Sequence, residues 1–201
     1  MVAYQASFNY PAIPPDVSGQ VSQKFSLRSL LRTDQETIWR IDQGVVRSLS
    51  LTEQGSVVTL GLWGPGDLVG QPLSLLKPYE LECLTAVQAT PLKSPHWKLE
   101  TDLLLYHLQQ LETLTVIRSY RRVEEMLIRL LVWLAERFGQ VSSLGTVINF
   151  RLTHQDIADL LGTTRVTITR ILMQLERQGA IERPSIRQIV LKEIDYWYYQ
   201  I

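Results

Sequence analysis

The chain has 201 residues, with 20 Lys and Arg residues balancing 20 Asp and Glu residues and a hydrophobic share of 45%. These values are typical of a globular protein with one large domain or two modest ones, and they exclude a disordered or fibrous chain. A single cysteine, Cys83, excludes an intramolecular disulfide, a cysteine zinc site and an iron–sulfur cluster held by this chain alone. No basic residue precedes Lys24 and no apolar run approaches the roughly 20 residues of a membrane span, so we expect a cytoplasmic protein without membrane contact.

Positive charge gathers near the C-terminal end, although the net charge is zero. Within residues 162–192 two residues are acidic, Glu176 and Glu182, and the basic ones are Arg165, Arg170, Arg177, Arg183, Arg187 and Lys192. Because affinity for a nucleic-acid backbone comes from Lys and Arg, this surplus is a candidate footprint for a nucleic acid. On charge alone, a solvated surface explains it equally well.

The N-terminal half predicts an arm followed by a β domain. Residues 1–23 carry prolines and no regular apolar period, which indicates an extended arm or tail. From residue 24 to residue 96, short strand-like segments alternate with Gly and Pro turns; the segments are 36–41, 45–51, 57–62 and 81–87. This spacing predicts an antiparallel sandwich or barrel.

A helical pattern occupies residues 97–138. Leu104, Leu108 and Leu111 recur at spacings of four and three, and a second apolar stripe follows out of register. We therefore expect two helices that meet near Tyr120. The second stripe is expected to pack within its own domain, whereas for the three leucines we favour a seam with a second subunit, as in a short coiled coil. The alternative is that they too pack within the chain.

Residues 152–177 form the most specific pattern. Thr153 can cap a short helix with Ile157 on its buried side, and Gly162 follows where a turn favours a positive φ. Thr163 or Thr164 then caps a longer helix. A helix, a short turn containing glycine and a second helix are the signature of a helix-turn-helix.

The outer face of the second helix has an unusual composition. Four residues lie there, away from the apolar side: Val166, Arg170, Met173 and Arg177; Arg165 precedes Val166. An exposed valine between two arginines is unusual for a solvated surface, whereas in a major groove Arg can bond guanine and Val can contact the thymine methyl. We therefore predict that Arg165, Val166 and Arg170 read bases. The alternative is a plain surface helix.

Two further sets of residues are predicted to contact phosphates. Hydroxyl, amide and backbone N–H groups at helix N-termini bind phosphate, and the residues concerned are Thr153, Gln155, Thr164 and Thr167. Residues 179–192 predict a strand, a turn and a strand, which is the wing of a winged helix. Arg183 and Arg187 of this wing are placed to reach phosphates.

With these features together, the chain resembles the transcription regulators typified by the catabolite activator protein and the fumarate–nitrate regulator. The resemblance runs from residue 25 to residue 192, and residues 164–170 are especially similar to the cyanobacterial global nitrogen regulator. It implies an α+β fold with an N-terminal antiparallel jelly roll of the cyclic-nucleotide-binding type, a long dimerisation helix and a C-terminal winged helix-turn-helix. The expected divisions are 1–23, 24–96, 97–122 and 123–201. The resemblance also implies a homodimer on palindromic double-stranded DNA, with RNA polymerase as a partner.

The effector pocket expected from this resemblance is degenerate. Cyclic-nucleotide-binding members use a Glu for the ribose and an Arg for the phosphate, whereas here Gln71 replaces the Glu and Glu80 or Glu82 falls where the Arg is required. A carboxylate repels a phosphate or a dicarboxylate such as 2-oxoglutarate in a partly buried pocket. Arg121 is a candidate for the missing positive charge, but it can equally pair with nearby carboxylates. We expect no binding of cAMP or cGMP, and the effector stays unknown.

Other chemistry finds little support in the sequence. His96 and His107 are candidate haem ligands, but neither has a partner at a telling spacing, so ordinary surface or core histidines are the better interpretation. His154 is expected to face DNA or solvent, and Cys83 to be a small buried residue. We expect no cofactor, no metal and no enzymatic activity, since a cupin-type enzyme needs a His/Glu metal cluster. The rival function is a small-molecule sensor or interaction module whose winged helix contacts protein.

Overall fold

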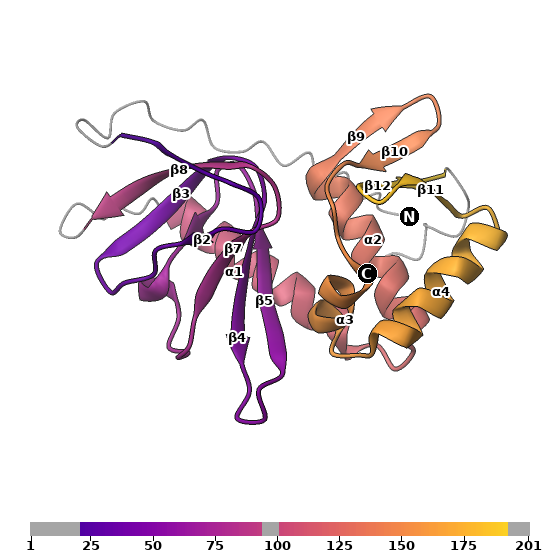
Figure 1. Cartoon of the computed structure of the whole chain (residues 1–201), viewed down its shortest axis with the longest axis horizontal. Coiled ribbons are helices and arrows are strands. Elements are labelled where there is room, and N and C mark those ends of the chain that lie inside the picture. The colour runs from indigo at the N-terminus through magenta and orange to yellow at the C-terminus, as the bar shows by residue number, and fades with distance from the viewer. Residues whose placement is uncertain (1–20, 94–100, 193–201) are drawn as a thin grey trace.

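A computed structural model describes residues 21–93 and 101–192, with side chains from residue 103 in the second range. The predicted N-terminal arm up to residue 20, His96 and the predicted helix start at residue 97 lie outside these residues. Figure 1 shows a β domain on one side, a helical module on the other, and α3 (His154–Leu161) between the β domain and α4 (Arg165–Arg177).

Two four-stranded antiparallel sheets form the N-terminal domain (Figure 1). The first has the order β1 (Gln23–Phe25), β8 (Val87–Lys93), β3 (Thr37–Gln43) and β6 (Leu68–Val69). The second has the order β2 (Leu30–Leu31), β7 (Glu80–Cys83), β4 (Val46–Leu51) and β5 (Val57–Trp63). A 3-10 helix, η1 (Gln71–Leu73), follows β6. This arrangement confirms the predicted jelly-roll class.

Alternation along the strands decides which side chains enter the core of this domain. In β7, Leu81 and Cys83 are buried, while Glu80 and Glu82 lie on the opposite face. The turn between β3 and β4 needs Gly44, which has φ +89° and where a Cβ would come within 2.3 Å of the Ala86 carbonyl oxygen.

The helical stretch breaks where the sequence predicts it. Helix α1 (Thr101–Ser119) and helix α2 (Val123–Phe138) are separated by residues 120–122. The apolar stripe of α2 is buried with α3 and α4 in a second core, as predicted, through Leu127, Leu130, Leu131 and Leu134. Leu114 and Ile117 of α1 join this core. The end of α1 therefore packs against the helix-turn-helix module.

The C-terminal module contains one more β hairpin than the sequence indicates. Its sheet has the order β11 (Ile181–Ser185), β12 (Gln188–Leu191), β10 (Gly145–Ile148) and β9 (Gly139–Ser142). Strands β11 and β12 form the predicted wing, while the β9–β10 hairpin was not predicted. In residues 21–93 and 101–192, no helix has the length and apolarity needed to cross a membrane.

Candidate nucleic-acid interface

Local capping explains why α3 and α4 form where they do. The Thr153 hydroxyl accepts from the Asp156 N–H at 3.0 Å, and the Asp156 carboxylate accepts from the Thr153 N–H at 2.8 Å, a reciprocal capping box. Gly162 ends α3 with φ +66°, in the left-handed region. The Thr164 hydroxyl then accepts from the Thr167 N–H and caps α4. Of the two predicted caps of α4, Thr164 is thus the one used.

Helix α4 has a buried face and an open face. Ile168, Ile171, Leu172 and Leu175 are buried in the module core. On the opposite side Val166 is 78% exposed, and Arg165, Arg170 and Arg177 are also exposed. In the described part of the chain, no acidic side chain pairs with any of these three guanidinium groups. The face is therefore cationic, with its hydrogen-bond donors unused.

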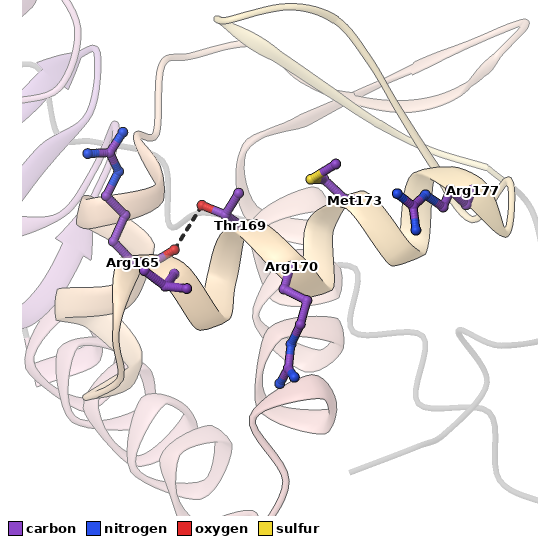
Figure 2. Close-up of a pocket in the computed structure, with 6 residues that line it drawn as sticks. Arg165, Thr169, Arg170, Met173 and Arg177 are labelled. Atoms are coloured by element: carbon purple, nitrogen blue, oxygen red, sulfur yellow. Dashed lines mark hydrogen bonds between the residues drawn. The ribbon is translucent and has the colours of Figure 1, made fainter.

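The open face of α4 encloses a shallow depression of about 450 Å³. It is lined by Arg165, Val166, Thr169, Arg170, Met173 and Arg177, which Figure 2 shows as sticks along the length of the helix. The Thr169 hydroxyl donates to the Arg165 carbonyl at 2.9 Å and so is turned back onto the helix. All three residues predicted to read bases share this surface with Met173 and Arg177, which the sequence analysis places on the same face without a base-reading role.

The residues predicted to hold phosphates lie at the starts of the two helices. The hydroxyls of Thr164 and Thr167 are 2.9 Å apart, and the Gln155 amide donates to Asp159 Oδ1 at 2.7 Å. A capping hydroxyl that accepts a backbone N–H keeps its own proton for a further acceptor. Only one of the Thr164 and Thr167 hydroxyls donates to the other, so this pair keeps one hydroxyl proton for a phosphate. The Thr153 hydroxyl also contacts the Asp156 carboxylate.

His154 is half-buried and both of its ring nitrogens have protein partners, whereas the sequence analysis expects it to face DNA or solvent. Its Nδ1 lies 2.7 Å from the Thr169 hydroxyl and its Nε2 lies 2.7 Å from Arg183 Nη1. Because that hydroxyl already donates to Arg165, His154 donates from Nδ1 and accepts from Arg183 at Nε2. Burial, then the charges of Arg183 and Arg165, lower the pKa of His154. The neutral ring thus ties α3 to α4 and to the wing.

The two predicted wing arginines differ in availability. Arg183 donates to both carboxylate oxygens of Glu176, at 2.8 and 2.5 Å, as well as to His154. The guanidinium group of Arg183 is therefore already engaged and is less available to a phosphate than predicted. The sequence did not reveal these contacts because Glu176 lies on another element. Arg187 lies exposed in the turn between β11 and β12, next to the exposed Ile186.

The three leucines predicted as a dimer seam do not lie on one open stripe. Leu108 is 60% exposed, but Leu111 packs against the core of the β domain and Leu104 is half-buried. Leu105, which the prediction omits, is 50% exposed. At about 100° per residue, Leu104 and Leu111 fall at the boundary between the buried and open faces of α1. The open apolar positions are therefore Leu105 and Leu108.

The four residues predicted for a degenerate effector pocket do not converge. The amide of the buried Gln71 donates to the carbonyls of Ser74 and Leu76, at 3.0 and 3.1 Å, and so orders the loop after η1. Arg121 is exposed at the break between α1 and α2. Glu80 and Glu82 lie outside the barrel because Leu81 takes the inward position. The predicted repulsion between these carboxylates and a ligand phosphate is therefore wrong.

Aromatic side chains fill the interior of the β domain instead. Trp39, Trp63 and Tyr79 are buried in its core, and Trp63 Nε1 donates to Ser48 Oγ at 2.8 Å. Burial raises the pKa of Tyr79 to about 12. Cys83 is fully buried, as expected.

The ring of His107 stacks on that of Trp63, with centroids 4.2 Å apart and planes 4° from parallel. Burial lowers the pKa of His107 to about 4. His107 is thus a packed core histidine. In the described residues, no group of three or more His, Cys, Asp or Glu side chains is placed to hold a metal ion.

Comparisons with known proteins agree with this arrangement. A family model for the Crp-like helix-turn-helix domain matches residues 125–196. The regulatory protein CysR of Synechococcus elongatus is 44% identical over 94% of this chain and 93% of its own length. The global nitrogen regulator of the same organism is 29% identical over 73% of each chain.

Among solved structures, FixK2 from Bradyrhizobium japonicum has the same fold, with a TM-score of 0.73 over 89% of this chain and 96% of its own, at 19% identity. The capped helix-turn-helix, the jelly roll and the near full-length similarity to CysR lead to one conclusion: the chain belongs to the CRP/FNR family of transcription regulators.

Proposed function

We propose that this protein is a homodimeric regulator that binds a palindromic DNA operator and reads its sequence through α4. The observation that carries the proposal is the open face of α4, where Arg165, Arg170 and Arg177 flank an exposed Val166 and line one depression. Buried or paired arginines cannot serve as base readers, whereas these guanidinium groups present unused donors. An apolar side chain among them suits a thymine methyl group.

On this proposal α4 enters the major groove with its N-terminus first. Arg165, Val166 and Arg170 then contact base edges, and Arg187 of the wing contacts phosphate. The capping hydroxyls at the starts of α3 and α4 contact the backbone on either side. Two arginines and one valine favour a half-site with guanines flanking a thymine, such as GTA or TGTGA. Two half-sites are inverted and centred about one helical turn apart.

Helix α1 is proposed to supply the dimer contact through its open face, with Leu105 and Leu108 at the centre. Two exposed leucines within one turn of a helix suit a narrow helix pair better than a solvated surface. By analogy with the family, residues 24–96, 97–122 and 123–201 are proposed to act as sensor-like domain, dimerisation helix and DNA-binding domain. RNA polymerase is the proposed protein partner, and the cytoplasm the proposed location.

The jelly roll is proposed to act without a cyclic nucleotide. Its core is filled by Trp39, Trp63 and Tyr79. The Gln71 amide donates to backbone carbonyls of the loop after η1, so these hydrogen bonds are not available to a nucleotide. Calorimetric titration with cAMP and cGMP is expected to give no heat of binding at micromolar concentration. Binding of either nucleotide in that range would overturn this part of the proposal.

Random-sequence selection followed by a gel shift tests the DNA-binding proposal directly. Purified protein is expected to enrich an inverted repeat and to shift it as a single complex containing two chains. Enrichment of no sequence would favour the rival function, in which the winged helix contacts protein. Adding cell extract to a parallel reaction tests for an effector, because an effector would change the shift without changing the selected sequence.

A further inference from the structure

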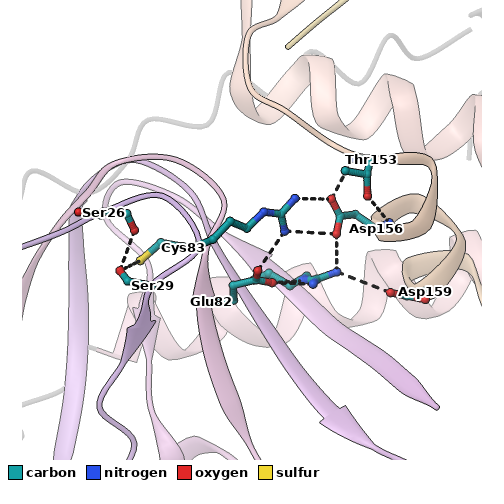
Figure 3. Close-up of polar contacts among 9 residues, drawn as sticks. Ser26, Ser29, Glu82, Cys83, Thr153, Asp156 and Asp159 are labelled. Atoms are coloured by element: carbon teal, nitrogen blue, oxygen red, sulfur yellow. Dashed lines mark hydrogen bonds and ion pairs between the residues drawn. The ribbon is translucent and has the colours of Figure 1, made fainter. Parts of the chain in front are cut away.

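Five charged side chains connect the β domain to the first helix of the helix-turn-helix, and we call them the ionic bridge (Figure 3). The β domain contributes Arg28, Arg47 and Glu82, and α3 contributes Asp156 and Asp159. Arg28 reaches Glu82 at 3.0 Å and Asp156 at 2.9 Å. Residues separated by more than 100 positions in the chain are thus joined.

Arg47 is the buried centre of the ionic bridge. Its Nη2 lies 2.5 Å from Glu82 Oε2, and its Nη1 lies 2.9 Å from Asp156 Oδ1 and 3.8 Å from Asp159 Oδ2. The contact with Asp156 is ionic without hydrogen-bond geometry, since Nη1 has no hydrogen-bond partner among the residues that the structure describes. Both Arg47 and Asp156 are largely shielded from water, and screening by salt is weak for such pairs.

The backbone at Arg28 is adapted to this contact. Arg28 has φ +65°, in the left-handed region, which a residue other than glycine adopts only at a cost in free energy. Hydrogen bonds with β7 hold it there: the Arg28 N–H donates to the Cys83 carbonyl at 2.8 Å, and the Cys83 N–H donates to the Ser29 carbonyl at 2.9 Å. This backbone conformation thus places the Arg28 guanidinium where it reaches Asp156 of α3.

The ionic bridge matters because the covalent link between the domains is a helix break. Residues 120–122 between α1 and α2 are not helical, so the angle of the module depends on side-chain contacts, among them the packing of Leu114 and Ile117 of α1 in the module core. Arg118 of α1 adds a second anchor by donating to the carbonyls of Leu160 in α3 and Thr59 in β5. Helix α3 in turn shares one core with α4, so holding α3 holds the DNA-reading face.

We propose that Arg28 and Arg47 are positioning residues for DNA recognition, which hold α3 through Asp156 and so set the half-site spacing that the dimer accepts. The inference rests on the proposed function above, because spacing has meaning only for two α4 helices on one DNA. In a dimer joined along α1, the angle of each module against α1 determines the separation of the two α4 helices. A palindrome with the wrong spacer then cannot engage both helices.

Two variants break the ionic bridge with little other change. Asp156→Asn removes the charge that both arginines contact, while its side-chain oxygen can still accept the Thr153 N–H of the capping box. Arg28→Ala removes the most exposed member, and because alanine keeps the Cβ, the left-handed backbone at this position is equally strained in the variant. Arg32→Ala is the matched control, because Arg32 lies in the same domain, is 82% exposed, and among the described residues forms an ion pair with Asp34 alone.

The measurement compares binding of each variant to a single half-site duplex and to palindromes whose spacers differ by one or two base pairs. Both bridge variants are expected to bind the half-site within about twofold of wild type and to lose about tenfold affinity for the optimal palindrome, with a broader spacer preference. The control is expected to match wild type throughout. Equal loss of half-site affinity would reveal a folding role for α3, and an unchanged spacer preference would show no positioning role; either result overturns the inference. Failure of the proposed function looks different, since wild-type protein would then bind no half-site at all.

Discussion

The arginines of the β domain and those of α4 differ in what their guanidinium groups contact. Arg47 is buried and its positive charge is met by Glu82 and Asp156, whereas Arg165, Arg170 and Arg177 stand exposed without a carboxylate in the part of the chain that the structure describes. The same residue type thus joins domains in one region and offers free donors in the other. Availability for a ligand depends on the partners of a side chain, which lie far away in sequence.

The largest expected effect concerns the assembly that brings two α4 faces together. Replacing both Leu105 and Leu108 with Glu places four carboxylates in the proposed seam of the dimer, where like charges repel. Sedimentation is expected to show monomers, and binding to the palindrome is expected to disappear. Leu75→Glu serves as the control, because this leucine is even more exposed and lies in the loop after η1, away from the proposed seam. A double variant that remains dimeric would place the seam elsewhere.

The next largest effect contrasts a paired arginine with a free one. Arg47→Ala leaves Asp156 and Glu82 with one partner fewer in a water-poor site, so the free energy of unfolding should fall by about 3–5 kcal/mol. Arg177→Ala should change it by less than about 0.5 kcal/mol, because Arg177 is an exposed residue of α4. Urea denaturation of both variants provides the comparison. Equal losses in the free energy of unfolding would contradict the distinction between a paired Arg47 and an unpaired Arg177.

These two regions also differ in how well the sequence predicts them. The helix-turn-helix was predictable because its signals are local: Thr153, Gly162 and Thr164 lie within twelve residues and act on neighbouring backbone. Pairing across the chain was not predictable, so the partners of Arg183 and the ionic bridge were missed. The register of β7 also escaped prediction, because Glu80 and Glu82 alternate with Leu81 and the sequence alone did not show which set faces inward. The β9–β10 hairpin was missed because Val141 and Leu144 are exposed, which removes the usual alternation signal.

A smaller effect tests whether water is excluded from His107, which stacks on Trp63 of the β domain. Burial lowers the pKa of His107 to about 4, so the folded protein keeps this ring neutral while the unfolded chain binds a proton below about pH 6.5. The contribution of the neutral His107 ring to the free energy of unfolding is complete above about pH 6.5. It is lost as the pH falls to about 4, which lowers the free energy of unfolding by about 3 kcal/mol.

His107→Phe keeps a ring on Trp63 but does not titrate, so it should remove this part of the pH dependence. His154→Asn, on the other side of the molecule, should leave it in place. The measurement is the free energy of unfolding of the wild type and both variants between pH 4 and pH 7.5. A wild-type slope that survives in His107→Phe would mean that His107 is open to water.

The most direct test of the central claim, that the open face of α4 reads DNA sequence, is the affinity of Arg170→Ala for the selected operator and for random DNA. Loss of a guanine contact should cost about 1–3 kcal/mol on the operator, relax the preference at one guanine and leave random DNA much less affected. Thr167→Ala is the matched comparison, because loss of a phosphate contact should weaken binding to both DNAs by a similar factor. If Arg170→Ala lowered binding to the operator and to random DNA by the same factor, Arg170 would be a backbone contact and the assignment of base reading to this face would be contradicted.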